Sequence, residues 1–143
     1  MNAMAARAFI LPRTGLRPLS FAGTCLVVLD DTAPPAWSRI KTALYRAEDG
    51  AFVTEILCAP PSNAAARRPW WQAVRAPGLA AAVASFEQAL PAADCACVPP
   101  PASAAAHTAR AAARAGLEAA QMLAFRHHVG LFLQACCLTL APP

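Results

Sequence analysis

The chain has 143 residues, a length typical of one domain, which excludes a large barrel or a two-domain enzyme. Hydrophobic residues make up 57% of it and charged residues 14%, so the chain is not disordered throughout. Twelve basic and eight acidic side chains give a net charge of +4 without a dominant block of like charge, which disfavours a protein that binds nucleic acid through one strongly basic face.

The first part of the chain predicts a small antiparallel β-meander of three or four strands. The candidate strands are hydrophobic runs bounded by proline, glycine or acidic turns: Ala8–Leu11, Leu19–Leu29, Trp37–Arg46 and Ala51–Cys58. In the second run, the side chains expected on one face are Leu19, Phe21, Cys25, Val27 and Leu29. The segment Ala47–Gly50 predicts a tight hairpin, because acidic residues precede a glycine that tolerates positive φ.

One helix is expected to cover this sheet. The preceding segment, Ala59–Ala76, contains three prolines and is interpreted as a loop. Pro77–Leu90 then predicts a helix, because proline is tolerated in a first turn and apolar residues recur at helical spacing. That stripe consists of Leu79, Val83, Phe86 and Leu90. Residues 1–90 therefore indicate an α+β domain in which one helix packs on the meander.

The last third of the chain predicts a long helical segment. Residues 91–102 are rich in proline and are interpreted as a linker, and residues 103–143 as an alanine-rich helical tail that Ser103 caps. The apolar run Val129–Ala141 is about thirteen residues long, short of the ~20 that span a bilayer, so no membrane span is expected.

Bulky apolar residues near the carboxyl end are the strongest candidates for a binding surface. They are Leu131, Phe132, Leu133, Leu138 and Leu140. Because they are distributed around the helix, one face of a small domain cannot cover them all. We therefore expect the chain to be a non-enzymatic interaction module that forms a homo-oligomer or binds a partner protein. Trp70 and Trp71 are a second candidate contact, and the alternative is that one of them closes the end of the sheet.

A weak contact with nucleic acid is an alternative function. Arg67 and Arg68 form the only adjacent basic pair, and Trp70 and Trp71 follow closely. Aromatic rings beside arginines can stack on bases, although two arginines neutralise few phosphates. The competing interpretation is a solvated loop with a tryptophan anchor.

The cysteines and histidines raise the question of a metal site. Six cysteines without a preceding secretory signal indicate reduced thiols in the cytoplasm of a bacterium. Candidate zinc ligands are Cys95, Cys97, His107 and His128. The alternative is that the cysteines are small buried hydrophobes or free loop thiols. No catalytic constellation is recognised, so neither an enzymatic activity nor a cofactor is expected.

Two segments carry a resemblance to a known family. They are Arg17–Gly23 and the hairpin segment Ala43–Val53, which are followed by a tryptophan and a short helix. Over Arg13–Leu90 the chain resembles the β-rich part of the small bacterial EXLDI-type proteins. The resemblance implies a strand, strand, hairpin and helix order, and it implies no defined activity.

Overall fold

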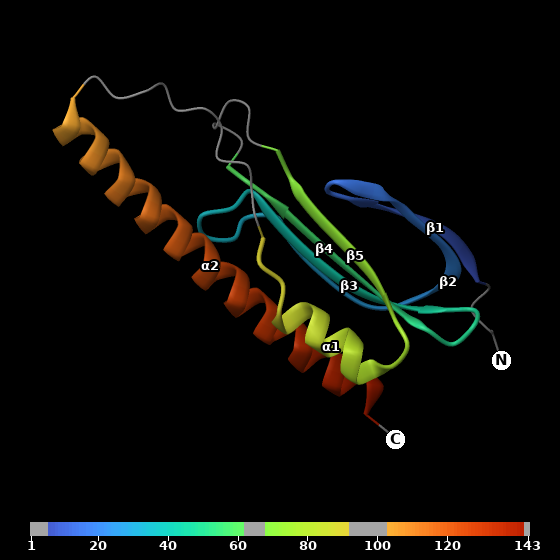
Figure 1. Cartoon of the computed structure of the whole chain (residues 1–143). Helices are drawn as coiled ribbons and strands as arrows, with labels where there is room; N and C mark the ends of the chain where they lie inside the picture. The colour runs from blue at the N-terminus through green and yellow to red at the C-terminus, as the bar shows by residue number, and fades with distance from the viewer. Residues whose placement is uncertain (1–5, 62–67, 92–102, 142–143) are drawn as a thin grey trace.

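The computed structural model describes residues 6–61, 68–91 and 103–141. Its elements are β1 (Arg7–Arg13), β2 (Leu16–Asp31), β3 (Arg39–Ala47), β4 (Phe52–Ala59), β5 (Trp70–Ala76), α1 (Leu79–Glu87) and α2 (Ala104–Leu140). The five strands form one antiparallel sheet in the order β1-β2-β3-β4-β5, and both helices cover the same face of it (Figure 1). The α+β prediction is confirmed, whereas the expected three or four strands are five.

The hairpin between β3 and β4 is confirmed. Gly50 has a φ of 89°, and its N–H donates to the carbonyl of Ala47 at 2.9 Å. The strands pair in unbroken register from Arg39 opposite Ala59 to Arg46 opposite Phe52. The acidic turn therefore sets the register of the two central strands.

The prediction that Ala59–Ala76 is a loop is wrong for its last part. Residues Trp70–Ala76 form β5, which pairs with β4 from Cys58 opposite Trp70 to Phe52 opposite Ala76. The prolines at positions 60, 61 and 69 all precede the strand, so none of them removes a donor from its ladder. The strand forms because its backbone pairs with β4, and it buries Ala73 and Ala76.

A β-bulge in β2 overturns the expected single face of that strand. The register against β3 shifts between Cys25 and Val27, which places one extra residue in β2. Cys25 consequently packs with Leu19 and Phe21 on one side of the sheet, while Val27 packs with the helices on the other. A bulge inverts the face of every residue that follows it, and a two-residue period cannot anticipate that inversion.

The sheet curls, so that the hairpin of β1 and β2 arches over the face opposite the helices (Figure 1). The hairpin tip is held to the start of β5: the N–H of Thr14 donates to the Trp71 carbonyl at 3.0 Å, and the Trp71 N–H donates to Thr14 Oγ1 at 2.8 Å. Phe9, Phe21 and Tyr45 pack their rings against one another inside the curl, at centroid separations from 4.8 to 5.3 Å. The concave face therefore has a core of its own.

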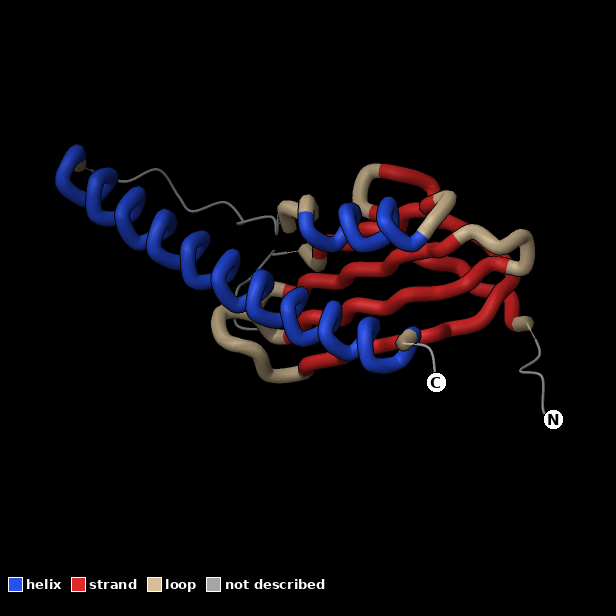
Figure 2. Tube along the Cα trace, turned by 90° about the horizontal axis from the view of Figure 1, so that it is seen from below, coloured by secondary structure: helices blue, strands red, loops and turns tan. Residues whose placement is uncertain are grey.

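The larger core lies between the convex face and the helices. The prediction that a helix covers the sheet is confirmed, although α1 buries Ala82 and Phe86, while Leu79 and Leu90 of the expected stripe are 42% and 66% exposed. Phe86 is thus the member of the expected stripe that enters the core, and Ala82 buries beside it in place of Leu79 and Leu90. The second helix crosses the same face, as Figure 2 shows.

The predicted cap of the long helix is confirmed, since Ser103 Oγ accepts from the Ala106 N–H at 3.1 Å. The amino-terminal half of α2 extends beyond the sheet (Figures 1 and 2), and its described side chains up to Gly116 are all exposed. The carboxyl-terminal half packs on the sheet. The predicted linker, residues 91–102, lies outside the described residues except for Pro91.

Candidate interaction surface

One face of α2 belongs to the core. Its buried residues recur at helical spacing and are Gln121, Phe125, His128, Val129, Phe132 and Cys136. Phe125 and Phe132 are 0% exposed and belong to the same cluster as Ile40 and Leu44 of β3. Because this stripe is buried against the sheet, only the opposite side of α2 is open to solvent or to a partner.

The point where α2 leaves the sheet is held by polar contacts. Trp37 Nε1 donates to the Gln121 carbonyl at 2.9 Å, and Gln121 Nε2 donates to the Ala36 carbonyl at 3.3 Å. Both contacts join the helix to the segment between β2 and β3. The helix rotation is therefore fixed at its exit from the core as well as inside it.

A second face of α2 is uncovered and carries exposed leucines, with the exposed polar residues His127 and Gln134 among them. Leu123 is 74% exposed, Leu131 47% and Leu138 83%. Spacings of eight and seven residues, at about 100° per residue, place these three leucines within about 80° of one another around the helix. They thus form one exposed stripe along the carboxyl-terminal half, which we call the leucine face.

The predicted interaction residues divide between the two faces. Leu131 and Leu138 lie on the leucine face, and Leu140 is 36% exposed at the helix end. Phe132 is fully buried, so it is a core residue and not a contact residue. Leu133 is half-buried against the core, and Leu123 was missed because it precedes the apolar run.

A groove of about 670 Å³ runs beside the leucine face. It lies between α2 and the end of β2 with the loop that follows, and its lining is mainly apolar. The lining residues are Leu29, Asp30, Asp31, Pro34, Pro35, Ala120, Leu123, Ala124, His127, His128 and Leu131. The leucine face therefore continues into a concave surface wide enough for further side chains.

His128 lies on the inner side of this groove. Its side chain is 4% exposed, and its Nε2 lies 2.9 Å from Thr42 Oγ1. Burial lowers the pKa of His128 below its ordinary value of 6.5, against the opposing charges of Asp31 and Asp30. The imidazole is thus neutral at physiological pH and serves the packing of α2 on β3.

This burial predicts a pH-dependent stability. Because the folded pKa of His128 lies below its unfolded value of 6.5, the unfolded chain binds more protons as the pH falls through 6.5. Stability is therefore fully present above 6.5 and is lost as the pH falls toward the folded pKa. Urea unfolding at several pH values should give a steeper loss for the wild-type chain than for His128→Gln. Equal slopes for the wild-type chain and His128→Gln would exclude His128 as the cause.

The two tryptophans do not form one stacking platform. Consecutive strand residues point to opposite faces of a sheet, so the indoles of Trp70 and Trp71 diverge from β5. Trp70 packs against the core beneath the helices, and both side chains are half-buried. Arg68 is exposed before the strand, and Arg67 lies outside the described residues. Stacking of bases beside the arginine pair therefore stays a prediction.

The candidate zinc ligands are not brought together in the described part of the chain. Cys95, Cys97 and the side chain of His107 lie outside the described residues. The Nε2 of His128 is engaged with Thr42. Among the described residues, no group of three or more His, Cys, Asp or Glu side chains is arranged to hold a metal ion.

A polar network that the sequence analysis missed lies on the concave face. The Oε1 atom of Glu55 accepts from the Tyr45 hydroxyl at 2.6 Å and lies 3.2 Å from Lys41 Nζ. Glu55 is 3% exposed, and Tyr45 is buried as well. Lys41 and Tyr45 share a face of β3, and Glu55 faces them from β4, so alternation along the two strands was the available signal.

Three of the described cysteines, Cys25 on the concave side and Cys58 and Cys136 in the core beneath the helices, are not activated nucleophiles. Burial raises the pKa of Cys25, which is half-buried near Lys41 and Glu55, and raises that of Cys58 to about 12 and that of Cys136 to about 11. These three thiols are protonated at neutral pH. On the concave face, the carboxylate of Glu55 is paired with the Tyr45 hydroxyl and the Lys41 ammonium group.

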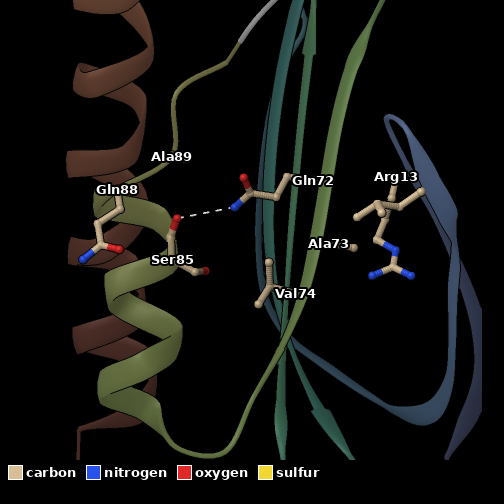
Figure 3. A pocket seen from close by; sticks show the side chains of 8 residues that line it. Arg13, Gln72, Ala73, Val74, Ser85, Gln88 and Ala89 are labelled. Carbon is tan, nitrogen blue, oxygen red and sulfur yellow. Dashed lines mark hydrogen bonds between the residues drawn. The ribbon is translucent and has the colours of Figure 1, made fainter.

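A smaller hollow of about 420 Å³ lies at the edge of the sheet beside β5. Figure 3 shows Arg13 and Ala73 on one side of this strand, and Gln72, Val74, Ser85 and Gln88 on the other. The Nε2 atom of Gln72 donates to the Ser85 carbonyl at 3.5 Å, which ties α1 to the strand. The hollow therefore straddles an open sheet edge and has no convergent catalytic groups.

The length and composition of residues Ala111–Leu140 would also allow a membrane span. Their best window has a mean hydropathy of 1.2, and 33% of it is buried within the structure. A core helix of a soluble protein passes the same test, so this property alone does not identify what covers the leucine face.

Comparison with known proteins identified no relative of this chain. No family model matches the chain, and searches of curated proteins and of solved structures also gave no match. The resemblance to the EXLDI-type proteins stays a prediction, and the function has to be argued from the surface described above.

Proposed function

We propose that this chain is a non-enzymatic protein-interaction module that binds another protein chain through the leucine face of α2. The observation that carries the proposal is the alignment of Leu123, Leu131 and Leu138, at 74%, 47% and 83% exposure, on a helix whose other face already covers the sheet. Single exposed leucines are ordinary on a protein surface, but an aligned set beside a groove is typical of a binding site.

The free energy available at this surface is substantial. Complete burial of one leucine contributes about 1.5–3 kcal/mol, and the three lie close enough along one helix for one partner to cover them together. The groove beside them adds Pro34 and Pro35 as a second wall. A helix laid along α2 would contact both walls at once, which is the usual mode of helix-in-groove recognition.

The projecting half of α2 supports the same function. The described side chains of α2 from Ala111 to Gly116 are all exposed. In proteins most of the stability of a helix comes from packing of one face against other elements, and the described side chains of this half form no buried face. A partner packed along the projecting half would stabilise it.

Replacing the leucine face with polar residues tests this function. In Leu123→Gln/Leu131→Gln/Leu138→Gln, association of the chain should be abolished, because the replaced residues are the uncovered apolar contacts. Sedimentation velocity over a concentration series should show wild-type species heavier than one chain and a monomeric triple variant. Circular dichroism should show the same helix content in both at the lowest concentration.

A matched control changes equally exposed residues elsewhere. Ile10, Leu16 and Leu90 are 71%, 65% and 66% exposed, and none of them is part of α2. The triple variant Ile10→Gln/Leu16→Gln/Leu90→Gln should associate as the wild type does. A wild-type chain that stays monomeric contradicts the proposal. So does one that binds phosphatidylcholine vesicles through the same leucines, which would assign the face to a lipid surface.

A further inference from the structure

We infer that the partner is a second copy of this chain, with the two α2 helices packed antiparallel about Leu123. This inference rests on the proposed function, and it names the occupant of the leucine face and its direction. It is carried by the order of large and small residues along that face, which is complementary to its own reverse.

The face changes character at Leu123. Toward the amino end it carries only small residues, and these are Ala105, Ala109, Ala112, Ala113, Gly116 and Ala120. Toward the carboxyl end it carries larger side chains, Leu131 and Leu138 together with the exposed polar residues His127 and Gln134. In an antiparallel pair centred on Leu123, the leucines of each copy meet the small residues of the other. In a parallel pair, leucines would meet leucines, and the alanine halves would meet each other across a gap.

Two glycines share this symmetry. Gly116 and Gly130 lie seven residues before and after Leu123, and at about 100° per residue both fall within about 20° of its direction. A Cβ atom added at either position would meet nothing within 4 Å in the single chain. Glycine is the least favourable helix residue after proline, and packing within one chain does not require it here.

Close approach of a second helix accounts for both glycines. Small residues let two helix backbones come together, and the antiparallel pair places Gly116 of one copy opposite Gly130 of the other. A two-fold axis through Leu123 makes the two glycine contacts equivalent. Each glycine then lies where the backbone of the other copy's helix comes close, and a larger side chain would hold the two helices apart.

The described arginine and glutamate side chains of α2 lie off this face. Arg114 and Glu118 pair with each other at 3.0 Å on the opposite side of the projecting half. Arg126, at the margin of the face, donates to the Glu87 carbonyl and is thereby drawn toward α1. In a pair centred on Leu123, residues 115–126 of the partner helix lie opposite the α2 residues that line the groove beside Pro34 and Pro35, and the two-fold axis repeats that contact.

Substitution of the glycines in the full chain tests the close approach. Gly116→Leu and Gly130→Leu should each raise the dimer dissociation constant at least about tenfold, measured by sedimentation equilibrium, while helix content is kept. Ala111→Leu is the control, because Ala111 is exposed on the same projecting half but lies off the face; it should change the constant less than about twofold.

A charge pair tests the direction. Ala113→Lys and Leu131→Glu should each weaken the dimer at least about tenfold, and the double variant should recover most of that loss, because the two new charges meet between antiparallel copies. The two positions are about 27 Å apart within one helix, so the recovery cannot arise inside one chain.

The outcomes separate this inference from the proposed function. A double variant no tighter than either single variant, or glycine variants that dimerise like the wild type, would overturn the antiparallel arrangement. The proposed function would still stand if the leucine-face triple variant remained monomeric while the wild type associated. A wild-type chain that is monomeric throughout would overturn both.

Discussion

Replacing Phe132 with alanine should lower the free energy of unfolding by about 3–5 kcal/mol, the usual cost of deleting a fully buried aromatic ring. Phe132 is 0% exposed, and its ring centroid lies 4.8 Å from that of Phe86 in α1. The ring therefore joins both helices to the core on the convex face. Its removal leaves a cavity at the point where α1, α2 and the sheet meet. Urea unfolding followed by circular dichroism measures the change.

Leu90→Ala is the control for this experiment. Leu90 is 66% exposed after the end of α1 and lies away from the leucine face, so its loss should change stability by no more than about 0.5 kcal/mol. Similar losses for Phe132→Ala and Leu90→Ala would show that α2 does not share the core. The same reasoning makes the chain after His128 indispensable, because Val129, Phe132 and Cys136 all contribute to that core.

The central part of the sheet was predictable because local chemistry determines it. Glu48, Asp49 and Gly50 require a tight turn, and the flanking runs alternate with a two-residue period. The faces of β3 and β4 followed from that alternation, with Ile40, Leu44 and Ile56 on the helix side. A hairpin needs no information from outside its own residues.

The features that escaped prediction depend on distant parts of the chain. The strand β5 is a strand because β4 lies beside it, and its prolines precede it. The bulge between Cys25 and Val27 lets β2 serve two cores, which a two-residue period does not show. Gly23 illustrates the same dependence: a Cβ there would overlap the carbonyl of Arg46, so only glycine allows β2 to lie this close to β3.

The candidate surface was predictable in kind but not residue by residue. An excess of bulky apolar residues near the carboxyl end indicated that one small domain could not cover them all. Which residues remain outside depends on the rotation of α2, which Trp37 and Gln121 fix across a long sequence separation. That rotation buries Phe132 and exposes Leu123, which lies before the apolar run Val129–Ala141.

Replacing Glu55 with alanine should also be costly, by about 3 kcal/mol. Removing one partner of a buried ion pair costs about 3–5 kcal/mol, and the lower end applies because Lys41 is 24% exposed in its side chain and can reach water. The change also leaves the buried Tyr45 hydroxyl without its acceptor at 2.6 Å. Urea unfolding at neutral pH measures the loss.

An exposed ion pair provides the matched control. Asp30 and Arg39 are bonded at 2.6 Å, but their side chains are 34% and 41% exposed. Water solvates both charges when the partner is removed, so Asp30→Ala should cost no more than about 1 kcal/mol. A loss as large as that of Glu55→Ala would show that burial is not what makes the concave network costly to break.

The complete replacement of the network decides whether it serves the fold alone. In Lys41→Met/Tyr45→Phe/Glu55→Leu no charge or hydroxyl is left buried without a partner, and apolar side chains of similar size fill the same space. Replacing a buried ion pair in this way is often neutral or stabilising, so the triple variant should unfold within about 1 kcal/mol of the wild type. Because the leucine face lies on the other side of the sheet, the triple variant should also associate as the wild type does. A triple variant that folds but no longer associates would mean that the concave face takes part in binding.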